Sequence, residues 1–193
     1  MAKNKQKSIF LNYFKPSLYV ENVSKINIAS LKSSGIKLII CDLDNTLISF
    51  SERMPSKESI EFIKAIKLSE IEFVLFSNNI RSRVENFSKK AEVANYFWDC
   101  KKPLTSKMTY IQKKFNFNKD EIIMIGDQLI TDIFFANRCY IKSILVTPLK
   151  RSSEGNKITN WFENIVLKNL EQKNILHEGF YTEGELGEKY EIL

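Results

Sequence analysis

Short apolar runs alternate along this chain with segments whose apolar residues recur at helical spacing. The candidate strands are residues 36–41, 72–76, 96–98, 122–125 and 143–146. The candidate helices are residues 56–69, 80–91, 105–115, 131–138 and 157–170. Strands that are apolar on both faces and alternate with helices are typical of a parallel sheet covered on both sides. The pattern therefore predicts an α/β fold around a parallel sheet of about five strands.

Composition excludes several kinds of chemistry. His177 is the single histidine, which argues against a Ser-His-Asp triad and against multi-histidine metal sites. Cys41, Cys100 and Cys139 are far apart in the sequence, so we expect small buried apolar residues and no disulfide or zinc site. No apolar run approaches the roughly 18 residues of a membrane span, and no segment resembles a signal peptide, so a cytoplasmic protein is expected. The net charge of +6 favours anionic partners.

Two carboxylates follow the first central strand. Asp42 and Asp44 come directly after the apolar run 36–41, and residues two apart on a strand point to the same side. Carboxylates this close repel each other, so the site calls for a cation or a shared proton. Mg²⁺, a hard cation that prefers oxygen ligands, suits this arrangement.

Polar residues also follow the next three strands. They are Ser77 and Asn78 after the second strand, Lys101 and Lys102 after the third, and Asp127 with Asp132 after the fourth. Each group alone is a common turn or helix cap. Because the carboxyl ends of parallel strands share one edge of a sheet, the convergence of acids, hydroxyl and ammonium favours one shared site.

These residues and their order resemble the haloacid-dehalogenase-like (HAD) phosphatase superfamily. Its four motifs match Asp42-Leu43-Asp44-Asn45-Thr46, then Ser77, then Lys102 with Lys101 as the adjacent rival, and finally Gly126 with Asp127 and Asp132. The resemblance covers roughly residues 37–148. It implies a Rossmann-like three-layer fold and a phosphoric monoester hydrolase.

The resemblance also implies roles for individual residues. Asp42 would be the nucleophile that takes the phosphoryl group as an aspartyl-phosphate. Asp44 would protonate the leaving oxygen and then activate water. The phosphoryl oxygens would be bound by Ser77, Asn78 and Lys102, and Lys102 would also offset the charge of the carboxylates.

The implied cofactor is Mg²⁺. Its ligands would be the side chains of Asp42 and Asp127 and the backbone carbonyl of Asp44, with Asp132 binding or orienting the metal shell.

The spacing of the motifs leaves no room for the cap domain that many HAD enzymes carry. Asp42 and Ser77 are 35 positions apart, and Lys102 and Asp127 are 25 apart. Each interval is filled by one helix and one strand. The expected fold is therefore capless, with an open site that accepts a phosphate presented on a protein, a nucleic acid or a membrane lipid.

At closer range the chain resembles the YqeG-like branch of the capless subclass IIIA. The matching stretches are "FKPSLYVENVSKI", "IICDLDNTL", "FSNN", "KKP" and "MIGDQLITDI". Relatives in this branch include phosphatidylglycerophosphate phosphatases, which implies hydrolysis of that anionic phospholipid by a protein at the inner face of the membrane. Phosphatase action on a nucleic-acid 3′-phosphate or a phosphoprotein stays open, as does a non-catalytic protein that binds RNA or ribosomes.

We expect four segments. Residues 1–35 form an N-terminal extension and residues 36–150 the phosphatase core. Residues 151–176 form a C-terminal helix that packs on the core, and residues 177–193 an acidic, poorly ordered tail. The extension combines lysines with aromatic residues, which suits an interfacial segment on an anionic membrane. The competing interpretation is that these aromatic residues cover the edge of the sheet.

Overall fold

A computed structural model describes residues 11–150 and 157–177 of the 193-residue chain. In this part of the chain the strands form one parallel sheet in the order β1-β6-β5-β2-β3-β4. The strands are β1 (Leu18–Val20), β2 (Leu38–Cys41), β3 (Glu72–Phe76), β4 (Asn95–Phe97), β5 (Ile122–Gly126) and β6 (Lys142–Val146). The predicted parallel sheet is confirmed, with six strands where about five were expected.

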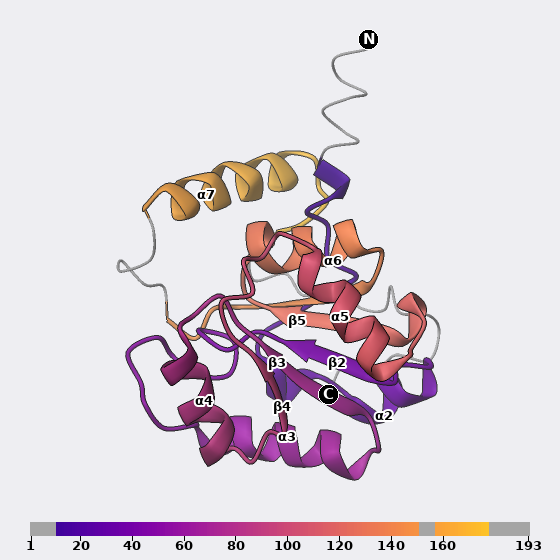
Figure 1. Cartoon of the computed structure of the whole chain (residues 1–193). Helices are drawn as coiled ribbons and strands as arrows, with labels where there is room; N and C mark the ends of the chain where they lie inside the picture. The colour runs from indigo at the N-terminus through magenta and orange to yellow at the C-terminus, as the bar shows by residue number, and fades with distance from the viewer. Residues whose placement is uncertain (1–10, 151–156, 178–193) are drawn as a thin grey trace.

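Helices cover both faces of the sheet and complete three layers (Figure 1). One face packs against α2 (Ile28–Ser33), α3 (Lys57–Leu68) and α4 (Arg81–Lys90). The other face packs against α5 (Ser106–Phe115) and α6 (Phe134–Cys139), with α7 (Lys157–Gln172) beside α6. Short 3₁₀ turns lie at Val23–Lys25 and Lys119–Glu121, and a π-helical turn at Leu129–Ile133 leads into α6.

Strand β2 shows why the pattern of apolar runs predicts this architecture. Ile39 and Cys41 belong to the core beneath α2, α3 and α4, whereas Leu38 and Ile40 belong to the core beneath α5 and α6. All four side chains are fully buried. A strand with no solvated face reads as an uninterrupted apolar run, and that is the signature of a central parallel strand.

Strand β1 was not predicted. It has three residues and pairs with β6, with Leu18 opposite Ile144. The side chains of Leu11 and Phe14 are also buried, and Phe14 stacks on Phe134 with ring centroids 4.9 Å apart. For residues 11–20 the structure confirms that the apolar side chains cover the sheet edge, and the sheet extends into the segment predicted as an N-terminal extension.

The intervals between the motifs hold no cap domain. Between β2 and β3 the helix α3 is the single helix, and between β4 and β5 there are α5 and one 3₁₀ turn. All of residues 42–127 are described, so the expected capless fold is confirmed. The carboxyl ends of these strands are therefore left open to the surface.

Three smaller expectations can be compared with the structure. Cys41, Cys100 and Cys139 are free and buried, as expected. His177 is half-buried, and its ring contacts the side chain of Asn174. The rest of the predicted acidic tail, residues 178–193, lies outside the described residues. Among the helices of the described ranges, none has the length and apolar character needed to cross a membrane.

The burial of β1 leads to a stability prediction. Leu18→Ala should lower the free energy of unfolding by about 2–5 kcal/mol, because it opens a cavity at a fully buried position. Leu68→Ala is the matched control, since Leu68 is 86% exposed and its truncation should change the free energy by less than about 0.5 kcal/mol. Urea denaturation would measure both, and equal small effects would contradict a structural role for β1.

Candidate active site

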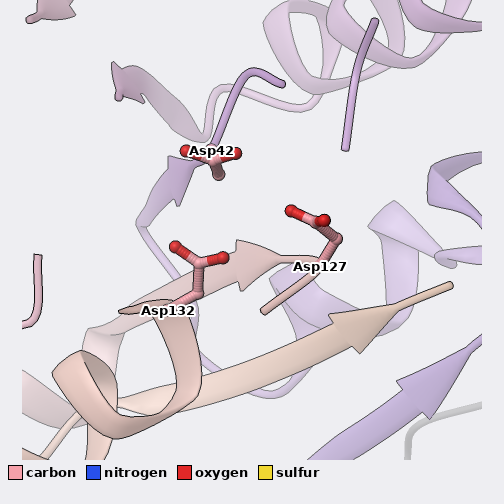
Figure 2. Close-up of side chains that lie close together, drawn as sticks. All are labelled: Asp42, Asp127 and Asp132. Atoms are coloured by element: carbon pink, nitrogen blue, oxygen red, sulfur yellow. The ribbon is translucent and has the colours of Figure 1, made fainter. Parts of the chain in front are cut away.

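The site is built from carboxylates at the ends of two paired strands. Asp42 follows β2 and Asp127 follows β5, and the Asp42 backbone N–H donates to the carbonyl of Ile125 at 2.8 Å. Asp132 lies on the π-helical turn that follows. Figure 2 shows these three side chains facing one another, and one oxygen from each lies within 4.8 Å of the others. Three buried carboxylates with this spacing can hold a divalent cation.

A single buried ammonium group lies among these carboxylates. The Nζ atom of Lys102 is 2.5 Å from Asp42 Oδ1 and 2.6 Å from Asp132 Oδ1, and the side chain is 1% exposed. Burial alone would lower the pKa of Lys102, but Asp132 and Asp42 raise it above its usual value. Lys101 is exposed and its Nζ lies 3.7 Å from Asp99. Of the two candidate lysines, the structure places Lys102 in the site.

The backbone of Lys102 is held by the side chain of Asn78. The Lys102 N–H donates to Asn78 Oδ1 at 2.7 Å, and Asn78 Nδ2 donates to the Lys102 carbonyl at 3.0 Å. The Asn78 amide therefore connects the end of β3 to the loop after β4. Ser77 is buried beside it, and its Oγ accepts a hydrogen bond from the N–H of Asn79 at 3.0 Å.

The side chain of Asp44 lies apart from the three clustered carboxylates. Asp44 Oδ1 accepts hydrogen bonds from Arg83 Nη2 at 2.8 Å and Nε at 3.1 Å, and Oδ2 accepts one from Asn79 Nδ2 at 2.8 Å. Asn45 has a left-handed backbone, with φ of 61°, which turns the chain directly after Asp44. Asp42 and Asp44 therefore line one pocket but have different partners, an ammonium and a guanidinium group.

The electrostatic state of the cluster favours a cation. Burial raises the pKa of Asp42 to about 7, against the opposing effect of Lys102. Burial, followed by the neighbouring Asp42 and Asp132, raises the pKa of Asp127 well above its usual value. Thr46 donates to Asp127 Oδ1 at 3.2 Å. One ammonium group does not balance three carboxylates, so a divalent cation would offset the remaining negative charge.

Gly126 has no side chain, and the carboxylate of Asp132 occupies the space that a side chain would fill. A side-chain carbon built at this position would overlap the carboxylate of Asp132. That carboxylate also accepts a hydrogen bond from the backbone N–H of Gln128 at 3.1 Å through Oδ2. A residue larger than glycine at position 126 would displace Asp132 from Lys102.

These groups line a surface pocket of about 310 Å³. Its walls carry the polar side chains of Asp42, Asp44, Ser77 and Lys102 together with the apolar side chains of Phe50 and Ile80. The hydroxyl of Ser77 and the ammonium group of Lys102 can bind phosphoryl oxygens, whereas the carboxylates would need a cation to do so. The apolar side chains of Phe50 and Ile80 are exposed at the surface.

Two residues of the site environment were not predicted from the sequence. Arg83 lies in the first turn of α4 and holds Asp44. Glu163 lies on α7, and its carboxylate accepts hydrogen bonds from the backbone N–H groups of Leu129 and of Ile130, the second at 3.1 Å. Burial raises the pKa of Glu163 to about 7. Both are among several charged residues on amphipathic helices, and nothing in their local sequence distinguishes them from solvated surface charges.

Comparison with known proteins agrees with this geometry. A family model described as "Mitochondrial PGP phosphatase" matches residues 4–150, which include every motif residue described above. The chain belongs to this family. It is a phosphatase of the HAD superfamily, in the YqeG-like branch, and the expected superfamily and enzyme class are confirmed.

Two relatives and one solved structure illustrate the similarity. "Probable phosphatase YqeG" of Bacillus subtilis (strain 168) is 31% identical over 163 residues, which cover 83% of this chain and 94% of that protein. "Phosphatidylglycerophosphate phosphatase 1, chloroplastic/mitochondrial" of Arabidopsis thaliana is 29% identical over 150 residues, or 72% of this chain and 42% of that protein. A crystal structure of an uncharacterized protein from Listeria monocytogenes serotype 4b shares the fold, with a TM-score of 0.51, 15% identity, and coverage of 61% of this chain and 84% of that one.

The raised pKa values of the carboxylates predict how stability depends on pH and metal. Without metal, the free energy of unfolding should fall as the pH rises from about 4 to about 7, because the folded protein holds protons on Asp42 and Asp127 that the unfolded chain releases near 3.8. Magnesium should stabilise the protein increasingly over the same range, since the cation favours the ionised carboxylates. At a concentration about 100 times its Kd, the gain should be about 2.7 kcal/mol.

Thermal unfolding with magnesium or with EDTA would measure this effect. Asp127→Asn should lose most of the gain in Tm from magnesium. Asp99→Asn, which changes an exposed carboxylate outside the cluster, should keep it. An equal gain in both variants would show that the buried cluster does not bind the metal.

Proposed function

We propose that this protein is a Mg²⁺-dependent phosphomonoesterase that works through an aspartyl-phosphate and converts phosphatidylglycerophosphate to phosphatidylglycerol. The observation that carries the proposal is the position of Asp42. It lies at the carboxyl end of the central strand β2, lines an open pocket, and has its carboxylate 2.5 Å from the ammonium group of Lys102. Membership of the phosphatase family supports the same chemistry.

In the first step a carboxylate oxygen of Asp42 attacks the phosphorus atom. The bond between phosphorus and the lipid oxygen breaks, and Asp44 donates a proton to that oxygen, which leaves as a neutral hydroxyl. Arg83 and Asn79 hold the Asp44 carboxyl beside the pocket. Lys102 and Ser77 bind the phosphoryl oxygens and stabilise the charge that develops on them.

In the second step a water molecule attacks the phosphorus atom of the aspartyl-phosphate. Asp44 takes the proton of that water, the bond between phosphorus and the Asp42 oxygen breaks, and inorganic phosphate leaves. We assign Asp42, Asp127 and the backbone carbonyl of Asp44 as metal ligands, with Asp132 orienting the shell. A bound cation would supply positive charge that offsets the negative charge of the nucleophile and of the phosphoryl group.

The substrate assignment rests on the open pocket and on the relatives. With no cap over the strand ends, a phosphate carried on a large surface can reach Asp42. The named Arabidopsis relative is a phosphatidylglycerophosphate phosphatase. We therefore propose an anionic phospholipid as substrate, and a cytoplasmic protein bound peripherally to the inner face of the membrane.

Phosphate release would test this function directly. The wild-type protein, with magnesium and phosphatidylglycerophosphate in mixed micelles, should release phosphate. Asp42→Asn should reduce turnover by about 1,000-fold or more, because the amide is no nucleophile. Substantial hydrolysis by Asp42→Asn would remove Asp42 from the mechanism.

A generic aryl phosphate serves as the second substrate in the same assay. Hydrolysis of the aryl phosphate without hydrolysis of the lipid would keep the phosphatase and discard the lipid assignment. A nucleic-acid 3′-phosphate and a phosphopeptide would then be the next substrates. Activity that persists in EDTA would refute the metal assignment.

Two neighbouring lysines provide a matched pair of variants. Lys102→Ala should lower turnover by about 100-fold or more, because it removes the buried ammonium group beside Asp42 and the phosphoryl oxygens. Lys101→Ala removes an exposed charge and should change turnover of the soluble aryl phosphate by about twofold or less. Steady-state rates for both variants would decide, and a larger loss for Lys101→Ala would contradict the placement of Lys102.

A further inference from the structure

Exposed apolar side chains follow four strands of the sheet. Because the strands are all parallel, the loops that follow them lie at the same edge, which is the edge that carries the pocket. The four residues are Phe50 after β2, Ile80 after β3, Leu104 after β4 and Leu149 after β6, with exposed fractions of 47%, 67%, 53% and 46%. We call these four residues the apolar rim.

Each residue of the rim lies next to the pocket. Phe50 and Ile80 form part of its wall. Leu104 lies two positions beyond Lys102, which also lines the pocket. The backbone N–H of Leu149 donates to the carbonyl of the pocket residue Asn45 at 2.9 Å. The rim therefore lies on the same side of the molecule as the pocket that contains Asp42.

Helix α7 extends this surface. Its carboxylate Glu163 bonds to the backbone of Leu129 and Ile130, between the pocket residues Gln128 and Thr131. Trp161 and Phe162, on the same part of the helix, are 59% and 49% exposed. In Figure 1, α7 lies beside α6.

Positive charge accompanies the apolar rim. Lys101 and Lys150 are close in sequence to Leu104 and Leu149, and their side chains are 66% and 59% exposed. Their partners are acidic residues at longer distances, Asp99 at 3.7 Å and Glu52 at 3.4 Å. Exposed pairs of this kind are weak, so the ammonium groups can exchange these partners for lipid phosphates.

We propose that the apolar rim is the surface by which this protein docks on an anionic lipid bilayer, with Phe50, Ile80, Leu104 and Leu149 inserted at the interface and Lys101 and Lys150 at the headgroups. The proposal deepens the function proposed above and rests on it, because a lipid phosphate held in the pocket would leave the protein between these side chains. Aromatic and aliphatic tips with adjacent lysines are the chemistry that an anionic interface selects.

Two of the three aromatic residues within residues 11–20 do not contribute to this surface, and the third, Tyr13, is 40% exposed and packs against Phe134. Phe14 and Tyr19 are buried against the sheet edge. The other large exposed apolar side chains include Leu68 and Tyr140, which precede β3 and β6 and so lie at the opposite edge of the sheet. These two residues offer a matched control with the same type of exposure away from the pocket.

Flotation with vesicles of phosphatidylcholine, with and without phosphatidylglycerol, would test the proposal. The full chain should bind the vesicles that contain phosphatidylglycerol. The double variant Leu104→Ser/Leu149→Ser should bind them about tenfold or more weakly, since it removes two interfacial leucine side chains. Leu68→Ser/Tyr140→Ser should bind like the wild type.

Hydrolysis of a soluble aryl phosphate, measured on the same samples, separates this proposal from the proposed function. Neither Leu104 nor Leu149 contributes to the pocket wall, so both double variants should keep wild-type turnover. Wild-type protein that binds vesicles through the rim but hydrolyses neither the aryl phosphate nor the lipid would refute the enzyme and leave the docking surface.

Three outcomes would overturn the docking surface. The first is a wild-type protein that does not bind the vesicles, and the second is a pair of double variants that bind them equally well. The third is self-association, measured by sedimentation velocity, that depends on Leu104 and Leu149 while vesicle binding does not. That result would identify the rim as a contact between copies of the chain.

Discussion

The ion pairs of Lys102 with Asp42 and Asp132 are the interaction on which the rest of the site depends. A buried ammonium group between two carboxylates is stable only if its position is well defined, because each partner left alone would be a buried unpaired charge. Two features of the fold fix the positions of the partners. Asn78 holds the Lys102 backbone through two hydrogen bonds, and Gly126 leaves the space that Asp132 occupies.

Sequence patterns predicted the site residues that directly follow an apolar strand. Asp42, Ser77 and Lys102 each follow an apolar strand, so their convergence follows from the parallel sheet alone. Arg83 and Glu163 could not be found in this way. Each is one of several charged residues on an amphipathic helix. Its contact with the site depends on how that helix packs against a segment distant in sequence. Strand β1 escaped prediction because it lies in a segment that mixes lysines with aromatic residues, a composition that also suits an interfacial segment.

The structure separates two apolar surfaces that look alike in the sequence. Phe14 and Tyr19, near the N-terminus, are buried along the edge of the sheet where β1 pairs with β6, and they belong to the core. The exposed apolar residues lie in separate loops, and parallel topology brings those loops to the end of the sheet that carries the pocket. In the sequence, the first group stands out as a cluster and the second appears as isolated residues. The cluster belongs to the core, whereas the isolated residues form the surface that we propose docks on lipid.

The absence of a side chain at Gly126 determines where the charged carboxylate of Asp132 can lie. Gly126 touches no substrate in the proposed reaction and has no titratable group. A methyl group at this position would nevertheless push the Asp132 carboxylate away from the ammonium group of Lys102. Lys102 would then have Asp42 as its remaining carboxylate partner. A stronger ion pair between the two would reduce the negative charge available on the proposed nucleophilic oxygen of Asp42. A purely steric change would thus act as an electrostatic one.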